Sequence, residues 1–201
     1  MRVLVVTHPT PKDIKKLITL GDSDVIIAVD QAVLALYKQR IKIDLAVGDF
    51  DSLKNDSMLS QLNVIRLNPI KDTTDTHQAL VEAKKMMPDE LILIGGIGGD
   101  RIDHFMIHTM LFDEFEDLKI IDDHTEMSLL KQGAYTVKTK GYVTYVAYPK
   151  AVISLHNFKY PLQSYLLNTY DPLCISNEVL GDIGEVIIHE GRVLQIKTLK
   201  E

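Results

Sequence analysis

The chain has 201 residues, of which 28 are acidic and 22 are basic, and its formal charge of −6 argues against a surface for non-specific nucleic-acid binding. Hydrophobic residues make up 46% and charged residues 25%, which is typical of a globular protein with one large or two small domains. The single cysteine, Cys174, excludes an internal disulfide, and no apolar run reaches the roughly 18 residues of a membrane helix, so we expect a cytoplasmic protein without a membrane span.

Short runs of Val, Ile and Leu recur through residues 1–124 without alternating with polar residues, as is typical of parallel strands buried on both faces. These strands are expected at residues 3–6, 25–29, 45–47, 64–67, 91–94 and 118–121. Apolar residues at helical spacing predict helices between them, at residues 14–21 (ended by Gly21), 32–36, 75–87 (ended by Pro88) and 102–115. The alternation predicts an α/β domain, in which a mostly parallel, Rossmann-like sheet carries helices on both faces.

The helical periodicity fades in residues 125–201, where short β-prone segments follow one another. Residues 135–140 alternate in polarity, and residues 142–148 are rich in Val and Tyr. The runs 186–189 and 192–196 flank Glu190-Gly191, which predicts a hairpin with a two-residue turn. We therefore expect a small antiparallel β-sandwich as a second domain.

Two aspartates follow the expected strand at 45–47, in the segment Gly48-Asp49-Phe50-Asp51-Ser52. Residues two apart in an extended backbone project to the same side, so Asp49 and Asp51 would lie together at the carboxyl end of a strand, where open α/β sheets bind ligands. Neighbouring carboxylates repel unless a cation or hydrogen bonds hold them. A simple turn, with Ser52 as the N-cap of a following helix, explains the same residues.

A second polar cluster, within residues 69–75, follows the expected strand at 64–67. Capping of the next helix by Thr74 or Asp75 explains one or two of its polar residues. Lys71 is suited either to pair with Asp72 or to contact phosphate.

A third cluster, Gly95-Gly96-Ile97-Gly98-Gly99, follows the expected strand at 91–94 and precedes Arg101, Asp103 and His104. Glycines let backbone N–H groups approach an anion, and Arg101 adds a donor fork suited to phosphate. The spacing matches neither a Walker motif nor a Rossmann fingerprint, and a flexible turn with an Arg101–Asp103 surface pair is the alternative.

The three clusters follow three strands at the same expected edge of one sheet, and two of them are acidic while the third combines glycine with arginine. Together they predict a site where a divalent metal bridges carboxylates to a polyphosphate, while glycine-rich backbone and Arg101 hold the rest.

The motifs Gly48-Asp49-Phe50-Asp51-Ser52, Lys71-Asp72-x-Thr74-Asp75 and Gly99-x-Arg101-x-Asp103-His104 resemble those of thiamine pyrophosphokinases in order and spacing. Residues 157–162 and 175–178 are similar to two further segments of that family. The resemblance implies transfer of a diphosphate group from ATP to the hydroxyl of thiamine, with release of AMP. It also implies an ATP-binding catalytic domain at residues 1–124, a thiamine-binding β-sandwich at residues 125–201, and a homodimer with the site near the subunit interface.

The resemblance further implies roles for individual residues. The residues expected to be catalytic are Asp49, Asp51, Asp75 and Asp103, and Mg²⁺ is expected on Asp49, Asp51 and Asp75. The residues expected to bind ATP and its phosphates are Lys71, Asp72, Thr74, Gly98, Gly99 and Arg101. The residues expected to bind thiamine are Tyr160, Ser176 and Asn177.

Four features depart from the family pattern, and one of them is Asp100, which stands where a small residue is usual. The segment Ala28-Val29-Asp30-Gln31-Ala32 lacks two glycines that are frequent there, and His108 stands where asparagine is common. The chain has no tryptophan to stack on thiamine, which leaves Tyr160 or Phe158 for this contact. Two alternatives therefore stay open: a diphosphokinase for another hydroxyalkyl heterocycle, such as a pterin, and a non-catalytic nucleotide-binding regulator.

Overall fold

A computed structural model describes residues 1–51, 53 and 57–200. Contacts divide the chain into two compact units, Met1–Asp123 and His124–Glu201. We call them the α/β unit and the β unit. The predicted fold class, a mostly parallel α/β sheet followed by an antiparallel β-sandwich, is confirmed. No helix in the described part of the chain combines the length and the apolarity needed to cross a bilayer.

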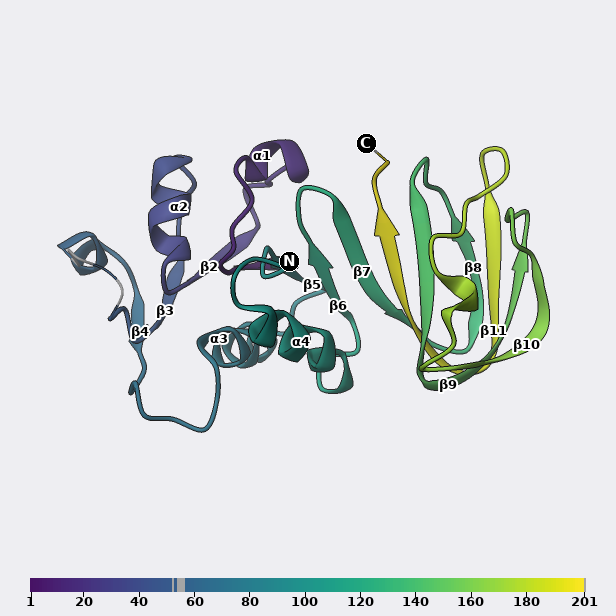
Figure 1. The fold of residues 1–201 in the computed structure, drawn as a ribbon. Coiled ribbons are helices and arrows are strands. Elements are labelled where there is room, and N and C mark those ends of the chain that lie inside the picture. Colours follow the sequence, from purple (N-terminus) through teal and green to yellow (C-terminus); the bar gives the residue numbers. More distant parts are fainter. Residues whose placement is uncertain (52, 54–56, 201) are drawn as a thin grey trace. The chain divides into compact units, whose positions relative to one another are not determined.

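The sheet of the α/β unit is parallel throughout its described pairings (Figure 1). Its strands are β1 (Arg2–Val6), β2 (Val25–Val29), β3 (Leu45–Gly48), β4 (Val64–Arg66), β5 (Glu90–Ile94) and β6 (Leu118–Ile121), in the spatial order β6-β5-β1-β2-β3-β4. Each lies within one residue of its predicted bounds, because strands buried on both faces are continuous apolar runs in the sequence.

Helices cover both faces of this sheet (Figure 1). The helices α1 (Ile14–Leu17) and α2 (Ala32–Lys38) share a buried cluster with Leu4, Ile26 and Ile92 on one face. The helices α3 (Asp75–Lys85) and α4 (Ile102–Met110) lie on the other face, and a 3₁₀ turn, η1 (Ser57–Gln61), precedes β4.

Three predicted helices are longer than the observed ones, and the one predicted at 75–87 ends two residues early, at Lys85. The first ends before Ile18, whose backbone is extended, rather than at Gly21, and the carbonyl of the following Thr19 accepts a hydrogen bond from Arg2 at 2.7 Å. The predicted helix at 102–115 ends at Met110 and passes into a 3₁₀ turn, η2 (Leu111–Asp113), whose tighter winding is compatible with burial of Leu111 and Phe112.

The position of β1 in this sheet creates a switch point. From β1 the chain adds strands on one side up to β4 and then returns to add β5 and β6 on the other side. Loops that leave the carboxyl ends of β1 and β5 therefore run to opposite faces and open a crevice between them, which is where such sheets bind ligands.

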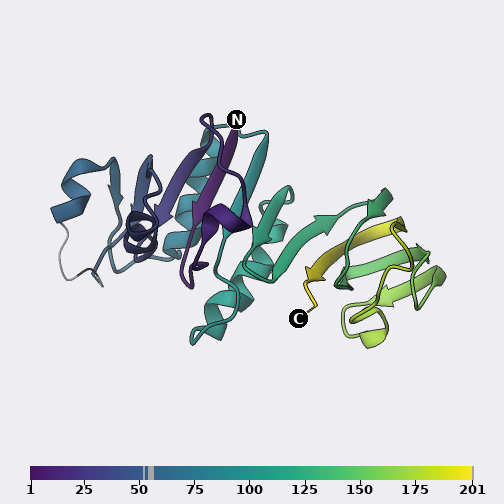
Figure 2. The same cartoon turned by 90° about the horizontal axis from the view of Figure 1, so that it is seen from above.

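The β unit is antiparallel throughout its described pairings (Figure 2). Its strands are β7 (Thr125–Leu130), β8 (Gly133–Val137), β9 (Tyr142–His156), β10 (Leu162–Asn168) and β11 (Gly184–Thr198), with a 3₁₀ turn, η3 (Pro172–Cys174), between the last two. β9 pairs with one edge of β11 along its length, and β7 and β8 pair with the other edge. Both halves of β9 contribute to one buried cluster, as Tyr145 and Leu155 show, so the strands enclose a sandwich core.

The predicted hairpin at Glu190-Gly191 is wrong, because β11 runs through both residues. Glu190 lies opposite Val152 and Gly191 opposite Ala151, with register shifts on either side. Gly191 has a φ of +80°, and a Cβ there would lie 2.0 Å from the carbonyl oxygen of Lys150. The glycine thus marks a bulge where two backbones approach closely, and not a turn.

Candidate active site

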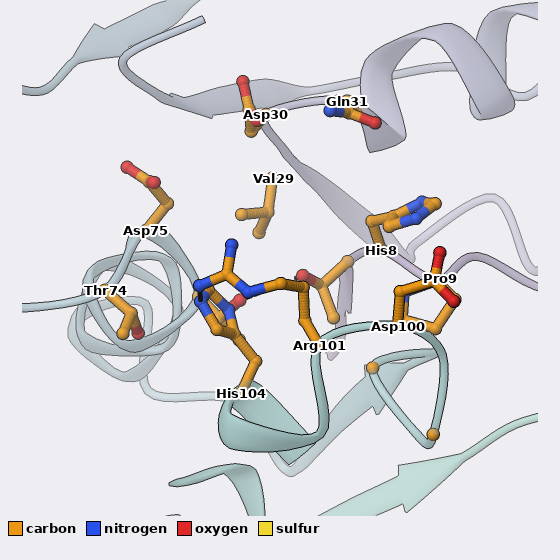
Figure 3. A pocket seen from close by; sticks show the side chains of 14 residues that line it. His8, Pro9, Val29, Asp30, Gln31, Thr74, Asp75, Asp100, Arg101 and His104 are labelled. Atoms are coloured by element: carbon orange, nitrogen blue, oxygen red, sulfur yellow. Dashed lines mark hydrogen bonds between the residues drawn. The ribbon is translucent and has the colours of Figure 1, made fainter. Parts of the chain in front are cut away.

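A cavity of about 300 Å³ lies at the carboxyl edge of the α/β sheet (Figure 3). Its walls come from the loops after β1, β2 and β5 and from the start of α3, so it occupies the crevice at the switch point. Of the residues predicted to form the site, Thr74, Asp75, Gly98 and Arg101 line this cavity.

Lys71 connects the first two polar clusters. Its Nζ lies 3.2 Å from Oδ2 of Asp49 and 3.1 Å from Oδ1 of Asp75, and it also donates to the carbonyl of Asn68 at 3.2 Å. Pairing with Asp72, one of the two roles considered for Lys71, is not seen, because Asp72 is exposed and Lys71 turns toward the sheet edge. Two acidic groups, one from the loop after β3 and one from the first turn of α3, thus converge on one ammonium group.

This arrangement shifts the ionisation of both partners. Burial alone would raise the pKa of Asp49, but the hydrogen bond from the Asp51 N–H and the Lys71 ammonium outweigh it and hold that pKa below its usual range. Burial alone would lower the pKa of Lys71, and the carboxylates of Asp75 and Asp49 outweigh this and raise it. Asp49 and Lys71 are therefore both ionised at neutral pH.

The expectation that Asp49 and Asp51 project side by side from an extended backbone is wrong. Phe50 between them has a φ of +59° and is buried, which turns the chain sharply. The N–H of Asp51 donates to Oδ1 of Asp49 at 3.3 Å, as in an Asx turn, and the side chain of Asp51 is exposed. Ser52, proposed above as a helix cap, lies outside the described residues.

The capping explanation holds for Thr74. Its hydroxyl accepts a hydrogen bond from the N–H of His77 at 3.1 Å and caps α3, while Asp75 occupies the first turn. The neighbouring Thr73 hydroxyl lies 2.7 Å from Nδ1 of His77, whose Nε2 lies 2.7 Å from Oε2 of Glu114. These bonds fix the loop that carries Lys71 and Asp75.

The glycine-rich loop after β5 presents unused donors. Gly95, Gly96, Gly98 and Gly99 all have positive φ, which only glycine adopts readily. The N–H of Gly96 donates to the carbonyl of Pro9, but the N–H groups of residues 97–99 donate to no acceptor among the described residues. Successive free N–H groups of this kind form a concave site for an anion.

Arg101 stands at the start of α4, beside this loop. It donates to the carboxylate of Asp103 through Nε at 3.2 Å and Nη2 at 3.0 Å, and Nη2 lies 2.6 Å from Nε2 of His104. The hydrogen bonds raise the pKa of Arg101 and lower that of Asp103. Figure 3 shows Arg101 and His104 together in the cavity, with Asp75 and Asp30 contributed by other elements.

Sequence reasoning missed one wall of the cavity. His8 and Pro9 after β1, and Asp30 and Gln31 after β2, also line it. They lie at strand ends on the same sheet edge as the predicted clusters, and this position was the signal that could have identified them.

The residues predicted to bind thiamine lie in the β unit and differ in exposure. The side chain of Asn177 is 1% exposed; its Oδ1 accepts from the N–H groups of Tyr160 and Glu178, and its Nδ2 donates to the carbonyl of Tyr160. Tyr160 is 53% exposed and Ser176 is exposed. Phe158 is buried against Tyr145, which excludes it as the residue that stacks on a ligand.

Comparison with known proteins identifies the family. The family model "Thiamin pyrophosphokinase, catalytic domain" matches residues 17–121, and "Thiamin pyrophosphokinase, vitamin B1 binding domain" matches residues 131–193. The chain belongs to the thiamine pyrophosphokinase family. Members form thiamine diphosphate by pyrophosphate transfer, and this chain is accordingly a transferase of that kind.

Individual thiamine pyrophosphokinases agree with this assignment. The enzyme of Bacillus subtilis is 28% identical over 187 residues, which cover 86% of each chain. The crystal structure of the Geobacillus thermodenitrificans protein superimposes with a TM-score of 0.87 at 27% identity, covering 100% of this chain and 99% of that one. The crystal structure of the Bacillus subtilis protein shares the fold with a TM-score of 0.89 over both full chains at 24% identity.

Sites of phosphoryl transfer commonly hold a divalent metal, and the acidic side chains at this sheet edge are the groups that would bind one. The described residues contain no group of three or more His, Cys, Asp or Glu side chains already arranged around a metal-sized space. Asp49 and Asp75 nevertheless direct one oxygen each to a common cationic group, within 3.2 Å. Hard carboxylate oxygens of this kind are the ligands that Mg²⁺ prefers, so the residues fit such an ion.

Proposed function

We propose that the chain transfers the β,γ-diphosphate of ATP to the hydroxyl of thiamine and releases AMP. The observation that carries this proposal is that hydrogen-bond donors suited to an anion and carboxylates suited to a cation lie at the same edge of the sheet. Free N–H groups at residues 97–99 and the guanidinium of Arg101 suit phosphate oxygens, and the Asp49–Lys71–Asp75 cluster suits a metal that accompanies them.

We propose that the glycine-rich loop holds the polyphosphate through Gly98 and Gly99. Arg101, Thr74 and Lys71 complete this phosphate site. The reaction forms a bond between the thiamine oxygen and Pβ and breaks the bond between Pβ and the oxygen that stays on AMP. Such a transfer needs positioning and charge stabilisation more than covalent help from the protein. Asp72 is exposed, and we propose that it contacts the nucleotide only from the rim.

The four aspartates proposed to be catalytic are Asp49, Asp51, Asp75 and Asp103. One of them accepts the proton that leaves the thiamine hydroxyl. Mg²⁺ is proposed to bind Asp49, Asp51 and Asp75, and when bound it would neutralise charge on the phosphate oxygens. Lys71, already between Asp49 and Asp75, supplies a second positive charge at the same place.

We propose that residues 1–124 form the ATP-binding catalytic domain and residues 125–201 the thiamine-binding domain. In the latter, Tyr160 and Ser176 are proposed to contact thiamine, because both are exposed. The ring of Tyr160 already lies 5.7 Å from the Lys159 ammonium, so it is placed to face a cation, and the thiazolium of thiamine is one. Asn177 is proposed to hold the Tyr160 backbone in place.

We further propose that the enzyme is a cytoplasmic homodimer with the site near the subunit interface. Helix α4 exposes Ile102, Met106 and Met110 at intervals of four residues, and a second subunit would remove this apolar face from water. The reduced, buried Cys174 suits a reducing compartment. Light scattering coupled to gel filtration tests the dimer.

Chromatography of nucleotide products tests the reaction. The chain is incubated with Mg-ATP, with and without thiamine, and AMP is expected to appear in step with thiamine diphosphate. Production of ADP would contradict diphosphate transfer, and binding of ATP without turnover would favour a regulator. Asp51→Asn is expected to lower turnover strongly, whereas Asp22→Asn, a change at an exposed aspartate outside the three polar clusters, serves as the matched control.

A further inference from the structure

His108 is a buried histidine on α4 that the proposed reaction does not use. Its side chain is 2% exposed, and Nδ1 lies 2.9 Å from the carbonyl oxygen of Gly96. Because a carbonyl oxygen only accepts hydrogen bonds, Nδ1 carries the proton. Nε2 then has no hydrogen-bond partner among the described residues, and burial lowers the pKa of His108, so the ring is neutral at physiological pH.

Gly96, whose carbonyl His108 contacts, is closely packed against three neighbouring residues. The N–H of Gly96 donates to the carbonyl of Pro9 at 3.0 Å, while its carbonyl accepts from His108. With a φ of +72°, Gly96 has no space for a side chain: a Cβ would lie 2.6 Å from Nδ1 of His108 and 2.8 Å from Cγ2 of Thr7. These contacts fix the position of the peptide between Gly96 and Ile97 in the glycine-rich loop.

The orientation of that peptide decides what it offers to the cavity. In a trans peptide the C=O and the following N–H point in opposite directions. Since His108 draws the Gly96 carbonyl toward α4, the N–H of Ile97 points away from α4, and it donates to no acceptor among the described residues. Rotation of this peptide by half a turn would instead present a carbonyl oxygen, which repels an anion.

We propose that His108 is a positioning residue, which keeps the Gly96–Ile97 peptide turned so that its N–H serves the polyphosphate. The inference rests on the proposed binding of ATP at this loop. Gly96 and Gly98, on either side of Ile97, both line the cavity, which places the peptide at its wall. A histidine that only filled space would be replaceable by any apolar side chain of similar size.

Two variants separate these roles. Asparagine carries its amide nitrogen as many bonds from Cβ as Nδ1 of histidine, so His108→Asn keeps the donor. His108→Leu places a methyl group there and removes it. Because one such hydrogen bond is lost, we expect His108→Leu to weaken Mg-ATP binding about tenfold. The Mg-ATP affinity of His108→Asn is expected to stay within about threefold of that of the wild type. The KM for thiamine is expected to be unchanged in both.

Isothermal titration with Mg-ATP and steady-state kinetics measure these effects, and urea denaturation checks that both variants fold. Equal ATP affinity of His108→Leu and wild type would overturn the role of His108 and leave the proposed function intact. Absence of ATP binding by the wild type would overturn both. The wild-type protein gives a second test: inorganic pyrophosphate should shift the NMR amide signal of Ile97, and shifts confined to Gly98 and Gly99 would also overturn the inference.

Discussion

The ammonium of Lys71 lies 3.1 Å from Oδ1 of Asp75, four residues further along the chain, at the start of α3. The same ammonium reaches Asp49 from the end of a different strand. One positive charge therefore holds together two segments that supply the proposed metal ligands, and its removal has consequences for stability as well as for binding.

Replacement of Lys71 by methionine leaves two neighbouring carboxylates without a counter-charge. Because the Lys71 side chain is only 16% exposed, we expect Lys71→Met to lower the free energy of unfolding by about 1–3 kcal/mol. Lys85→Met is the matched control, since Lys85 pairs with Glu82 but is 62% exposed, and its expected effect is below about 1 kcal/mol. Urea denaturation of both variants measures the difference.

The stability difference between wild type and Lys71→Met should depend on pH. The pKa of Asp49 is lowered in the folded state, so its contribution is present above its ordinary value of 3.8 and disappears as the pH falls through the folded value. The pKa of Lys71 is raised, so its contribution is present below 10.5 and disappears as the pH rises through the folded value. A difference that stays constant outside this window would contradict the ion pair.

Arg101 is expected to act as a bidentate donor rather than as a simple charge. Arg101→Lys keeps the charge but loses the fork, and we expect it to raise the KM for ATP about 10-fold, with up to about 100-fold for Arg101→Gln. The KM for thiamine serves as the internal reference. An Arg101→Lys enzyme with wild-type ATP affinity would show that the guanidinium geometry is not used.

Two glycines of the same loop should respond differently to alanine. At Gly96 the new methyl group meets His108 and Thr7 at less than van der Waals distance, whereas at Gly98 nothing lies within 4 Å. We expect Gly98→Ala to cost about 1 kcal/mol of stability from its positive φ and to lower ATP affinity, and Gly96→Ala to cost more than about 2 kcal/mol. Thermal denaturation compares them directly; equal losses would mean that the loop readily rearranges around Gly96.

Variants of Asn177 and Ser176 distinguish a residue that supports the backbone of the β unit from one that contacts thiamine. Asn177→Ala removes partners of the Tyr160 and Glu178 backbone, and we expect it to lower the free energy of unfolding by about 2–3 kcal/mol. Ser176→Ala, at an exposed neighbour, should change stability by less than about 0.5 kcal/mol but raise the KM for thiamine. A Ser176→Ala enzyme with unchanged KM for thiamine would place the thiamine contact elsewhere.

The sequence predicted the strands of the α/β unit well, because burial on both faces leaves an unbroken apolar run such as that of β1. It predicted β11 poorly, because the Glu190-Gly191 pair that marks a hairpin turn also marks a bulge. The distinction depends on the backbone of β9, and in particular on the Lys150 carbonyl, which is distant in the sequence.

The candidate site was likewise predicted where local sequence decides the structure and missed where distant residues decide it. Strand-end position brought the acidic clusters and Arg101 to one sheet edge, as predicted. The sequence did not reveal that Lys71 would bridge Asp49 and Asp75, since that pairing depends on how loops from β3 and β4 fold over the edge. Nor did it reveal that Asn177 is part of the interior, because a polar residue in a loop looks the same whether it binds a ligand or supports its neighbours.

The central strands of the two units differ in when they are synthesised relative to the strands they pair with. β1, at the centre of the α/β sheet, precedes every strand it pairs with, so the nascent chain can add β2 and later β5 to an existing template as it emerges from the ribosome. β11, at the centre of the β unit, follows all of its partners. β9 can pair with β10 beforehand, but β7 and β8 lack their β11 partner until that last strand has been translated.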